Sequence, residues 1–203
     1  MLRFGPNHGS TVIALLPLLE EANRTRAFTV AVLRALAERG IAGILPDLPG
    51  TGDSLIGTHE ARLADMREAF GSLARTLARP VSLAIRSGAL LDGGADLAGR
   101  WHLTPQDGPT LIRELGRIAP LPASPVRPIE VAGNLLAPAL LAELAEAFPS
   151  PPSRIARLTG DTRPADITLD GPPLWRRAEP GTDAALAEHV ANDIAGWIVT
   201  CAG

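Results

Sequence analysis

The sequence predicts an α/β protein with one open, mostly parallel sheet that is flanked by helices on both faces. Short, almost wholly apolar runs alternate along the chain with longer segments whose apolar residues recur every three or four positions. The joints between them are short, which is typical of strand–helix–strand units with right-handed crossovers. We expect residues 1–203 to form a single domain.

The first elements form such a unit. An apolar run at 11–16 predicts a strand that is covered on both faces. A helix is expected over 24–39, ending at Gly40, because glycine favours the left-handed cap of a helix. A second buried strand is expected at 41–45.

The later elements continue the alternation. Residues 58–77 predict an amphipathic helix, since their leucine, methionine and phenylalanine side chains share one face. We then expect a strand at 81–85, a helix at 87–98, a strand at 101–104, a helix at 110–118, a strand at 129–132, a helix at 138–148, strands at 154–159 and 165–169, and a helix at 182–199 capped by Thr182. Four prolines predict an extended connector over 119–128.

The composition excludes several kinds of chemistry. The chain has 19 basic and 22 acidic residues, a net charge of −3, and no basic residue other than arginine. Without lysine there is no Schiff-base or Walker A lysine. The single cysteine, Cys201, excludes disulfide frameworks and cysteine-based zinc sites. The near-neutral charge balance carries no electrostatic footprint for nucleic acid.

The apolar run at 12–19 is relevant to where in the cell the protein is found. It is too short for a membrane span, and Glu20 and Glu21 behind it are unlike the flank of a signal peptide. We expect a cytoplasmic protein without a membrane span, metal or cofactor. Self-association into a homo-oligomer stays open.

Polar residues follow three of the predicted strands. Ligands of open α/β sheets bind outside the carboxyl ends of the strands, so we expect these loops to meet in one hollow. The candidate binding residues are Glu20, Glu21, Asn23, Arg24, Arg26, Asp47, Asp53 and Ser54. The guanidinium groups of Arg24, Arg26 and Arg86 suit a carboxylate or a phosphate. The alternative is that the acidic neighbours neutralise them in a buried ion-pair network.

The third strand end resembles a nucleophile elbow, the G-x-S-x-G turn of hydrolases. On that frame Ala84 comes first, Arg86 takes the nucleophile's place, and Gly88 comes last. Ser87 lies one step late, where a serine more often caps the following helix. The candidate catalytic residues are Ser87, Arg86 and, as the base, His102, although no histidine follows the last strand as the hydrolase order requires.

Several motifs together resemble one family. Residues 17–26 (PLLEEANRTR) resemble the P-F-x-E-E-M-N-K-S-R-R signature of the second type of exosortase-A-system-associated hydrolases. Residues 47–54 (DLPGTGDS) match the family's D-L-P-G-C-G-D-S, and 84–91 (AIRSGALL) are similar to its G-L-R-x-G-A-L-L. Residues 129–134 and 171–175 are similar to its V-E-V-A-G-Y and G-P-P-F-W.

The resemblance implies a bacterial protein with an α/β-hydrolase-like fold. It implies hydrolysis of an ester or related acyl bond in an exopolysaccharide-linked pathway, with a small-molecule or acyl substrate. The alternative is a catalytically degenerate hydrolase fold that binds an anionic metabolite or a partner protein. Because the chain reaches the strand at 11–16 almost at once, we expect the antiparallel strands that usually open this fold to be missing.

Overall fold

A computed structural model describes residues 1–122 and 125–201. Seven strands form one sheet in the order β1-β3-β2-β4-β5-β8-β9. Their bounds are β1 Leu2–Phe4, β2 Thr11–Leu15, β3 Ala42–Leu45, β4 Val81–Ile85, β5 Gly99–Leu103, β8 Arg154–Leu158 and β9 Ile167–Leu169. Every neighbouring pair is parallel except β1 with β3. The predicted open, mostly parallel sheet is confirmed.

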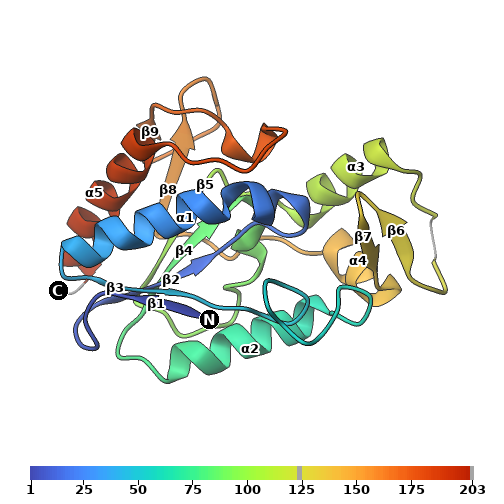
Figure 1. Ribbon diagram of the computed structural model, residues 1–203, viewed down its shortest axis with the longest axis horizontal. Helices are drawn as coiled ribbons and strands as arrows, with labels where there is room; N and C mark the ends of the chain where they lie inside the picture. Colours follow the sequence, from blue (N-terminus) through green and yellow to red (C-terminus); the bar gives the residue numbers. More distant parts are fainter. Residues whose placement is uncertain (123–124, 202–203) are drawn as a thin grey trace.

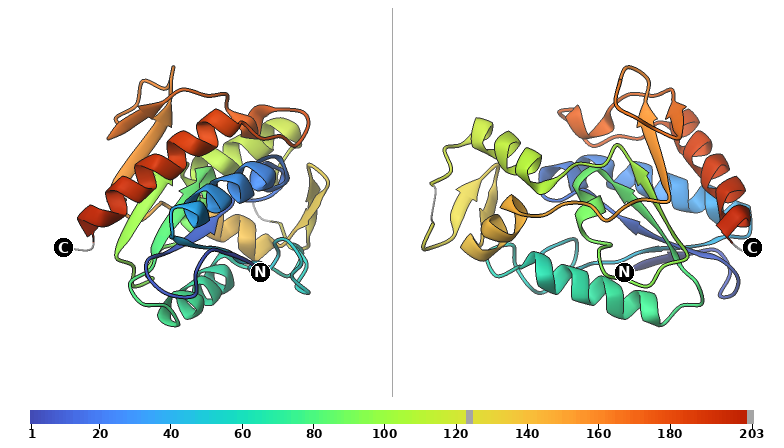
Figure 2. Two further views of the ribbon diagram at one scale, coloured as in Figure 1. Left: turned by 60° about the vertical axis from the view of Figure 1, so that its left-hand side comes forward. Right: turned by 180° about the vertical axis from the view of Figure 1, so that it is seen from behind.

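Helices cover both faces of this sheet. Helices α1 (Glu20–Glu38) and α5 (Ala184–Cys201) pack together on one face, and α2 (Leu63–Arg75) lies on the other (Figures 1 and 2). Alternate residues of a strand point to opposite faces. In β2, Val12 and Ala14 therefore join the apolar cluster beneath α1 and α5, whereas Ile13 and Leu15 join the cluster beneath α2.

A small cap lies between β5 and β8 in the chain. It consists of α3 (Gly108–Ile118), the hairpin β6 (Ile129–Val131) and β7 (Asn134–Leu136), and α4 (Pro138–Ala145), gathered at one end of the molecule (Figure 1). The strand predicted at 129–132 thus belongs to a separate two-stranded sheet. Ala132 and Gly133 both have positive φ, 50° and 74°, as a two-residue hairpin turn requires. Of the predicted connector 119–128, residues 123 and 124 lie outside the described residues.

The predicted start of the helix over 58–77 is corrected by a contact from a distant residue. Helix α2 begins at Leu63 instead of residue 58, because Glu143 of α4 accepts hydrogen bonds from the backbone N–H of Leu63 (2.6 Å) and of Ala64 (3.3 Å). A carboxylate 80 positions away therefore caps this helix.

The helix predicted over 87–98 is wrong. The structure has only a short 3-10 helix, η1 (Arg86–Leu90). The chain then turns so that the Asp92 side chain enters the core, where it accepts a hydrogen bond from Ser82 Oγ (2.6 Å).

The two ends of the described chain also differ from expectation. One antiparallel strand, β1, is present at the edge of the sheet, so the expectation that the opening antiparallel strands are missing is corrected. The three residues of β1 are mostly exposed, so the sequence shows no apolar run there that would predict a strand. At the other end, Asp183 and not Thr182 accepts the capping bond from the N–H of Leu186 (2.9 Å). No helix among the described residues has the length and apolarity needed to cross a bilayer.

Candidate functional site

The turn after β4 has the backbone geometry of an elbow. Arg86, in the nucleophile's place, has a left-handed φ of 53°. Two residues on, a Cβ at Gly88 would lie 2.5 Å from the carbonyl oxygen of Leu15 and 2.7 Å from that of Leu16. Only glycine lets the elbow pack this closely against the end of β2. The predicted frame of residues 84–88 therefore describes the backbone correctly.

The Arg86 side chain is buried within an ion-pair network. Its Nε and Nη2 donate to the two carboxylate oxygens of Glu21 at 3.2 and 3.1 Å, and Nη2 also donates to Glu114 Oε2 at 3.2 Å. Gln106 Nε2 donates to that same oxygen of Glu114 at 2.7 Å. On another side, the guanidinium lies over the ring of Trp175. Three segments far apart in the chain, around residues 21, 106–114 and 175, thus hold this arginine in one position.

Burial and Arg86 act in opposite directions on the pKa of Glu21. Burial raises the pKa of Glu21, and the hydrogen bond and charge of Arg86 offset only part of that effect, so the pKa stays above its usual value. Arg86 therefore favours the ionised form of the Glu21 carboxyl, against the effect of burial.

A cavity of about 460 Å³, here the elbow cavity, opens beside Arg86. It is lined by Thr104 at the end of β5, Trp175, and the loop after β8, which includes Asp161 and Arg163. Thr104 has a φ of 48°, a strained conformation for a β-branched residue and one that concentrates at functional sites. Thr104 Oγ1 and Trp175 Nε1 are both buried without a hydrogen-bond partner in the described part of the chain.

Asp161 is a residue that the sequence analysis missed. It accepts hydrogen bonds from Arg163 Nη2 (2.7 Å) and Arg157 Nη1 (3.1 Å), and the hydrogen bond from Arg163 is the main reason why its pKa lies below the usual range. The carboxylate therefore fixes the wall of the elbow cavity. Its position in the loop after β8 is the signal that was available, because hydrolase sequences carry an acid between the nucleophile and the histidine.

Ser87 is fully buried, and its Oγ accepts a hydrogen bond from the backbone N–H of Leu18 at 2.9 Å. It does not cap a following helix, as the sequence favours; it ties the elbow to the loop after β2. A catalytic role for Ser87 stays a prediction, and this contact gives its hydroxyl a structural task instead.

His102 also lies in the core and not in a cavity. It is fully buried on β5, with Nε2 2.8 Å from Asp92 Oδ2, the oxygen that also accepts from Ser82. In a hydrolase triad the histidine lies between serine and aspartate. Here the aspartate lies between the other two, and all three side chains are buried.

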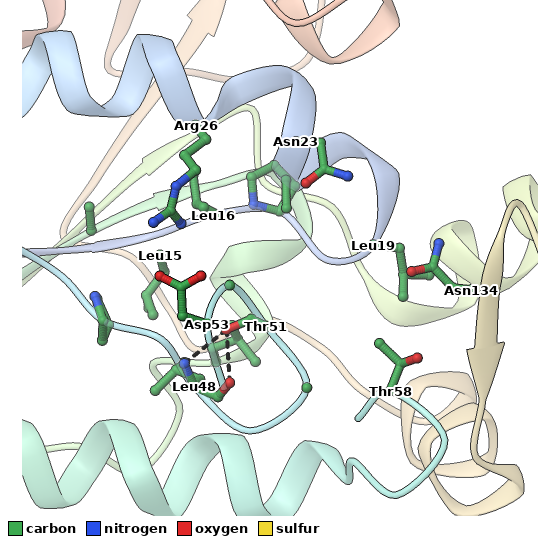
Figure 3. Close-up of a pocket in the computed structure, with 17 residues that line it drawn as sticks. Leu15, Leu16, Leu19, Asn23, Arg26, Leu48, Thr51, Asp53, Thr58 and Asn134 are labelled. Atoms are coloured by element: carbon green, nitrogen blue, oxygen red, sulfur yellow. Dashed lines mark hydrogen bonds between the residues drawn. The ribbon is translucent and has the colours of Figure 1, made fainter. Parts of the chain in front are cut away.

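A second cavity, here the loop cavity, has a volume of about 380 Å³. Of the predicted binding residues, Asn23, Arg26 and Asp53 line it (Figure 3). Its walls are the end of β2, the first turn of α1 and the loop after β3.

The remaining predicted binding residues support the surrounding loops. Arg24 Nη1 donates to the carbonyl oxygen of Trp175 (3.1 Å), and Glu20 Oε1 accepts from Asn134 Nδ2 (3.2 Å). Ser54 Oγ accepts from the N–H of Ile56 (3.2 Å), and Asp47 Oδ1 accepts from the N–H of Asp53 (3.3 Å).

The predicted common hollow is wrong, because the two cavities share no lining residue. The turn into α1 separates them. Leu19 lines the loop cavity, whereas Glu21, two residues later, bonds to Arg86. Among the residues described, no group of three or more histidine, cysteine, aspartate or glutamate side chains is placed to hold a metal ion.

Comparison with known proteins places the fold. No protein-family model matches the chain, and no curated protein matches it in sequence. Among solved structures it is similar to the esterase Est1E from Butyrivibrio proteoclasticus with ferulic acid bound, with a TM-score of 0.62 over 98% of this chain and 93% of that one, at 15% identity. The chain has the α/β-hydrolase fold.

Two further solved structures are similar to the chain over nearly its whole length. Tomato methylketone synthase I aligns with a TM-score of 0.55 at 10% identity, over 98% of this chain and 99% of that one. The monoacylglycerol lipase of Paleococcus ferrophilus aligns with a TM-score of 0.51 at 15% identity, over 98% of both chains. At sequence identities this low, the structural similarity establishes the α/β-hydrolase fold but not the reaction.

Proposed function

We propose that this protein binds an anionic small molecule in the elbow cavity and does not use serine chemistry. The observation that carries the proposal is the arginine in the nucleophile's place. Nε and Nη2 of Arg86 bind carboxylates, whereas Nη1 donates to none of the residues that the structure describes, and Arg86 lines the cavity. The two N–H groups of Nη1 are therefore left for a ligand.

The charge of the cavity favours an anion. Three arginines line it: Arg86 is paired with Glu21 and Glu114, Arg163 is paired with Asp161, and the exposed Arg176 forms no ion pair with a described residue, so Arg176 supplies the free positive charge. Because Glu21, Glu114 and the Trp175 ring already hold Arg86, a ligand would not have to order that side chain on binding.

The unpartnered polar atoms point to the same ligand class. Thr104 Oγ1 and Trp175 Nε1 are hydrogen-bond donors without acceptors among the described residues. A buried donor without an acceptor costs about 1–3 kcal/mol. Both residues line the elbow cavity, so a carboxylate or phosphate that reached these atoms after a side-chain movement would supply the missing acceptors.

Tryptophan fluorescence tests the proposal, because Trp175 lines the elbow cavity whereas Trp101 and Trp197 line neither cavity. Titration with inorganic phosphate and, separately, with succinate is expected to give a saturable change for at least one anion. The change is expected to disappear in Trp175→Phe. No saturable change with either anion contradicts the proposal.

Two adjacent arginines provide a matched pair of variants. Arg176 lines the elbow cavity and Arg177 does not, although both are exposed. Arg176→Gln is expected to weaken the binding seen by fluorescence, and Arg177→Gln to leave it unchanged. Equal affinities for the two variants would show that the anion binds elsewhere.

A second candidate function is hydrolysis of an ester or related acyl bond. It is supported by the left-handed elbow at Arg86. For either function, the proposed role in an exopolysaccharide-linked pathway and the proposed bacterial origin rest on the resemblance of the motifs at 17–26 and 47–54. A panel of short acyl esters, assayed with the parent and Ser87→Ala, distinguishes the candidates. Turnover that Ser87→Ala abolishes supports hydrolysis through Ser87, equal turnover in the two proteins excludes Ser87 as the nucleophile, and absent turnover contradicts hydrolysis.

A further inference from the structure

We propose that the loop cavity is a second ligand site, and that it takes a zwitterionic amino acid with an apolar side chain. The loop cavity shares no lining residue with the elbow cavity, so this proposal does not depend on the proposed function. It rests on two opposite charges at the rim and an apolar floor.

The negative charge is Asp53, presented by a rigid loop. Thr51 Oγ1 accepts from the N–H of Leu48 (2.8 Å) and donates to its carbonyl oxygen (2.9 Å). The other carboxylate of the loop, Asp47, accepts from the N–H of Asp53 and from the amino group of Met1. Asp47 is therefore occupied in holding the loop, whereas the exposed Asp53 carboxylate forms no hydrogen bond or ion pair with any described residue.

The positive charge is Arg26, on the first turns of α1. Its side chain is one-third exposed, and its one ion pair with a described residue is a long one of 3.8 Å to Asp47. Figure 3 shows the Arg26 guanidinium and the Asp53 carboxylate pointing toward each other across the cavity. No ion pair joins the two among the contacts of the described residues, so a charged group of each sign is open to a ligand.

The floor between them is apolar. Leu15, Leu16, Leu48 and Leu91 line the cavity and offer no side-chain hydrogen bond. Asn134 also lines it; its Nδ2 donates to Glu20 and to the carbonyl oxygen of Ala132, which leaves its Oδ1 as an acceptor.

An α-amino acid matches this arrangement. Its carboxylate would accept from Arg26, its ammonium group would donate to Asp53, and an aliphatic side chain would lie against the leucines. A ligand with only one of the two charges leaves the other rim residue without a partner, so both charges are needed for tight binding.

Isothermal titration calorimetry with four related probes tests this inference. L-Leucine carries both charges and the apolar group, 4-methylpentanoate lacks the ammonium group, 3-methylbutylamine lacks the carboxylate, and glycine lacks the apolar group. L-Leucine is expected to bind at least about tenfold more tightly than each of the others. Equal binding of any one of the other three, or no binding of leucine, overturns the inference.

Matched variants locate the site. Arg26→Gln and Asp53→Asn are each expected to weaken leucine binding at least about tenfold. The controls are Arg34→Gln on the exposed face of the same helix and Glu68→Gln on α2, which line neither cavity. Because Asp53 has no described partner, Asp53→Asn is expected to keep the parent's melting temperature. Loss of leucine binding in the controls, or its retention in Asp53→Asn, contradicts the site.

The two sites also differ in their optical signal. Leucine is expected to leave tryptophan fluorescence unchanged, because no tryptophan lines the loop cavity. A leucine-induced change that Trp175→Phe abolishes would place leucine in the elbow cavity and overturn the inference, without bearing on whether phosphate or succinate binds there.

Discussion

The guanidinium of Arg86 lies over the indole of Trp175, 5.3 Å from the ring centroid. Arg86 occupies the nucleophile's place at the elbow, and Trp175 belongs to the loop after the last strand, where the hydrolase order places the catalytic histidine. A cation–π contact therefore stands where a serine hydrolase has its nucleophile and base. This contact helps to hold the Arg86 guanidinium beside the elbow cavity, which both residues line.

The Arg86 network predicts a strong effect of removing one charge. Arg86→Gln leaves Glu21 buried without its cation, so we expect a loss of about 3–5 kcal/mol of unfolding free energy. Because burial raises the pKa of Glu21, the loss is expected to be smaller at acid pH, where a larger share of Glu21 is protonated. Urea unfolding at pH 7 and pH 5 measures both quantities.

The double variant provides the control. Glu21→Gln added to Arg86→Gln removes the stranded charge, and we expect it to recover part of the lost stability. If the double variant is as unstable as the sum of the two single variants, Glu21 and Arg86 are not coupled.

Most strands of the sheet could be predicted because each of them corresponds to a short pattern of neighbouring residues in the sequence. Strands such as β2 and β4 are buried on both faces and read as continuous apolar runs. The start of α2 could not be predicted, because it depends on Glu143, which lies far away in the chain. The end of η1 could not be predicted either, because it depends on Asp92, whose partner Ser82 lies in the core. A local sequence pattern does not reveal such contacts.

The candidate site was predictable in part for the same reason. Arg86 follows a recognisable strand, and Asn23, Arg26 and Asp53 lie in conspicuous polar loops. Thr104, in contrast, becomes notable only through its left-handed backbone and its unpartnered hydroxyl. The division into two cavities required knowledge of how the turn into α1 packs.

Close packing at the elbow predicts that Gly88→Ala is strongly destabilising. The added Cβ would meet two backbone carbonyl oxygens, of Leu15 and Leu16, and neither can move without shifting β2. We expect a loss of more than about 2 kcal/mol. Gly116→Ala in α3 is the matched control, because nothing lies within 4 Å of its added Cβ. It should stabilise the protein by up to about 1 kcal/mol, since alanine favours helix. Thermal unfolding of both variants tests this, and equal destabilisation contradicts it.

The buried hydroxyl of Ser87 predicts a structural effect for Ser87→Ala. Removing it leaves the N–H of Leu18 without its acceptor, which we expect to cost about 1–3 kcal/mol. Amide hydrogen exchange at Leu18 should become faster than in the parent, whereas exchange in α5 should change only through the global loss of stability. Unchanged protection at Leu18 would show that another group accepts this hydrogen bond.

Asp193 predicts how stability depends on acid. Its carboxylate joins α5 to the sheet by accepting from Arg154 Nε (2.7 Å), Arg154 Nη2 (2.6 Å) and Trp101 Nε1 (2.8 Å). Burial raises the pKa of Asp193, but the hydrogen bonds from Arg154 and Trp101 outweigh it, so the pKa lies below its ordinary value of 3.8.

A carboxyl with a lowered pKa in the folded state contributes stability that is fully present above its unfolded pKa and is lost as the pH falls through its folded pKa. Asp193→Asn is therefore expected to lower the unfolding free energy by about 1.5–3 kcal/mol at pH 7, and the difference from the parent should shrink below pH 3.8. Urea unfolding from pH 7 to pH 3, with Glu68→Gln as the exposed control, measures this, and a difference independent of pH would show that the charge of Asp193 contributes nothing to folding.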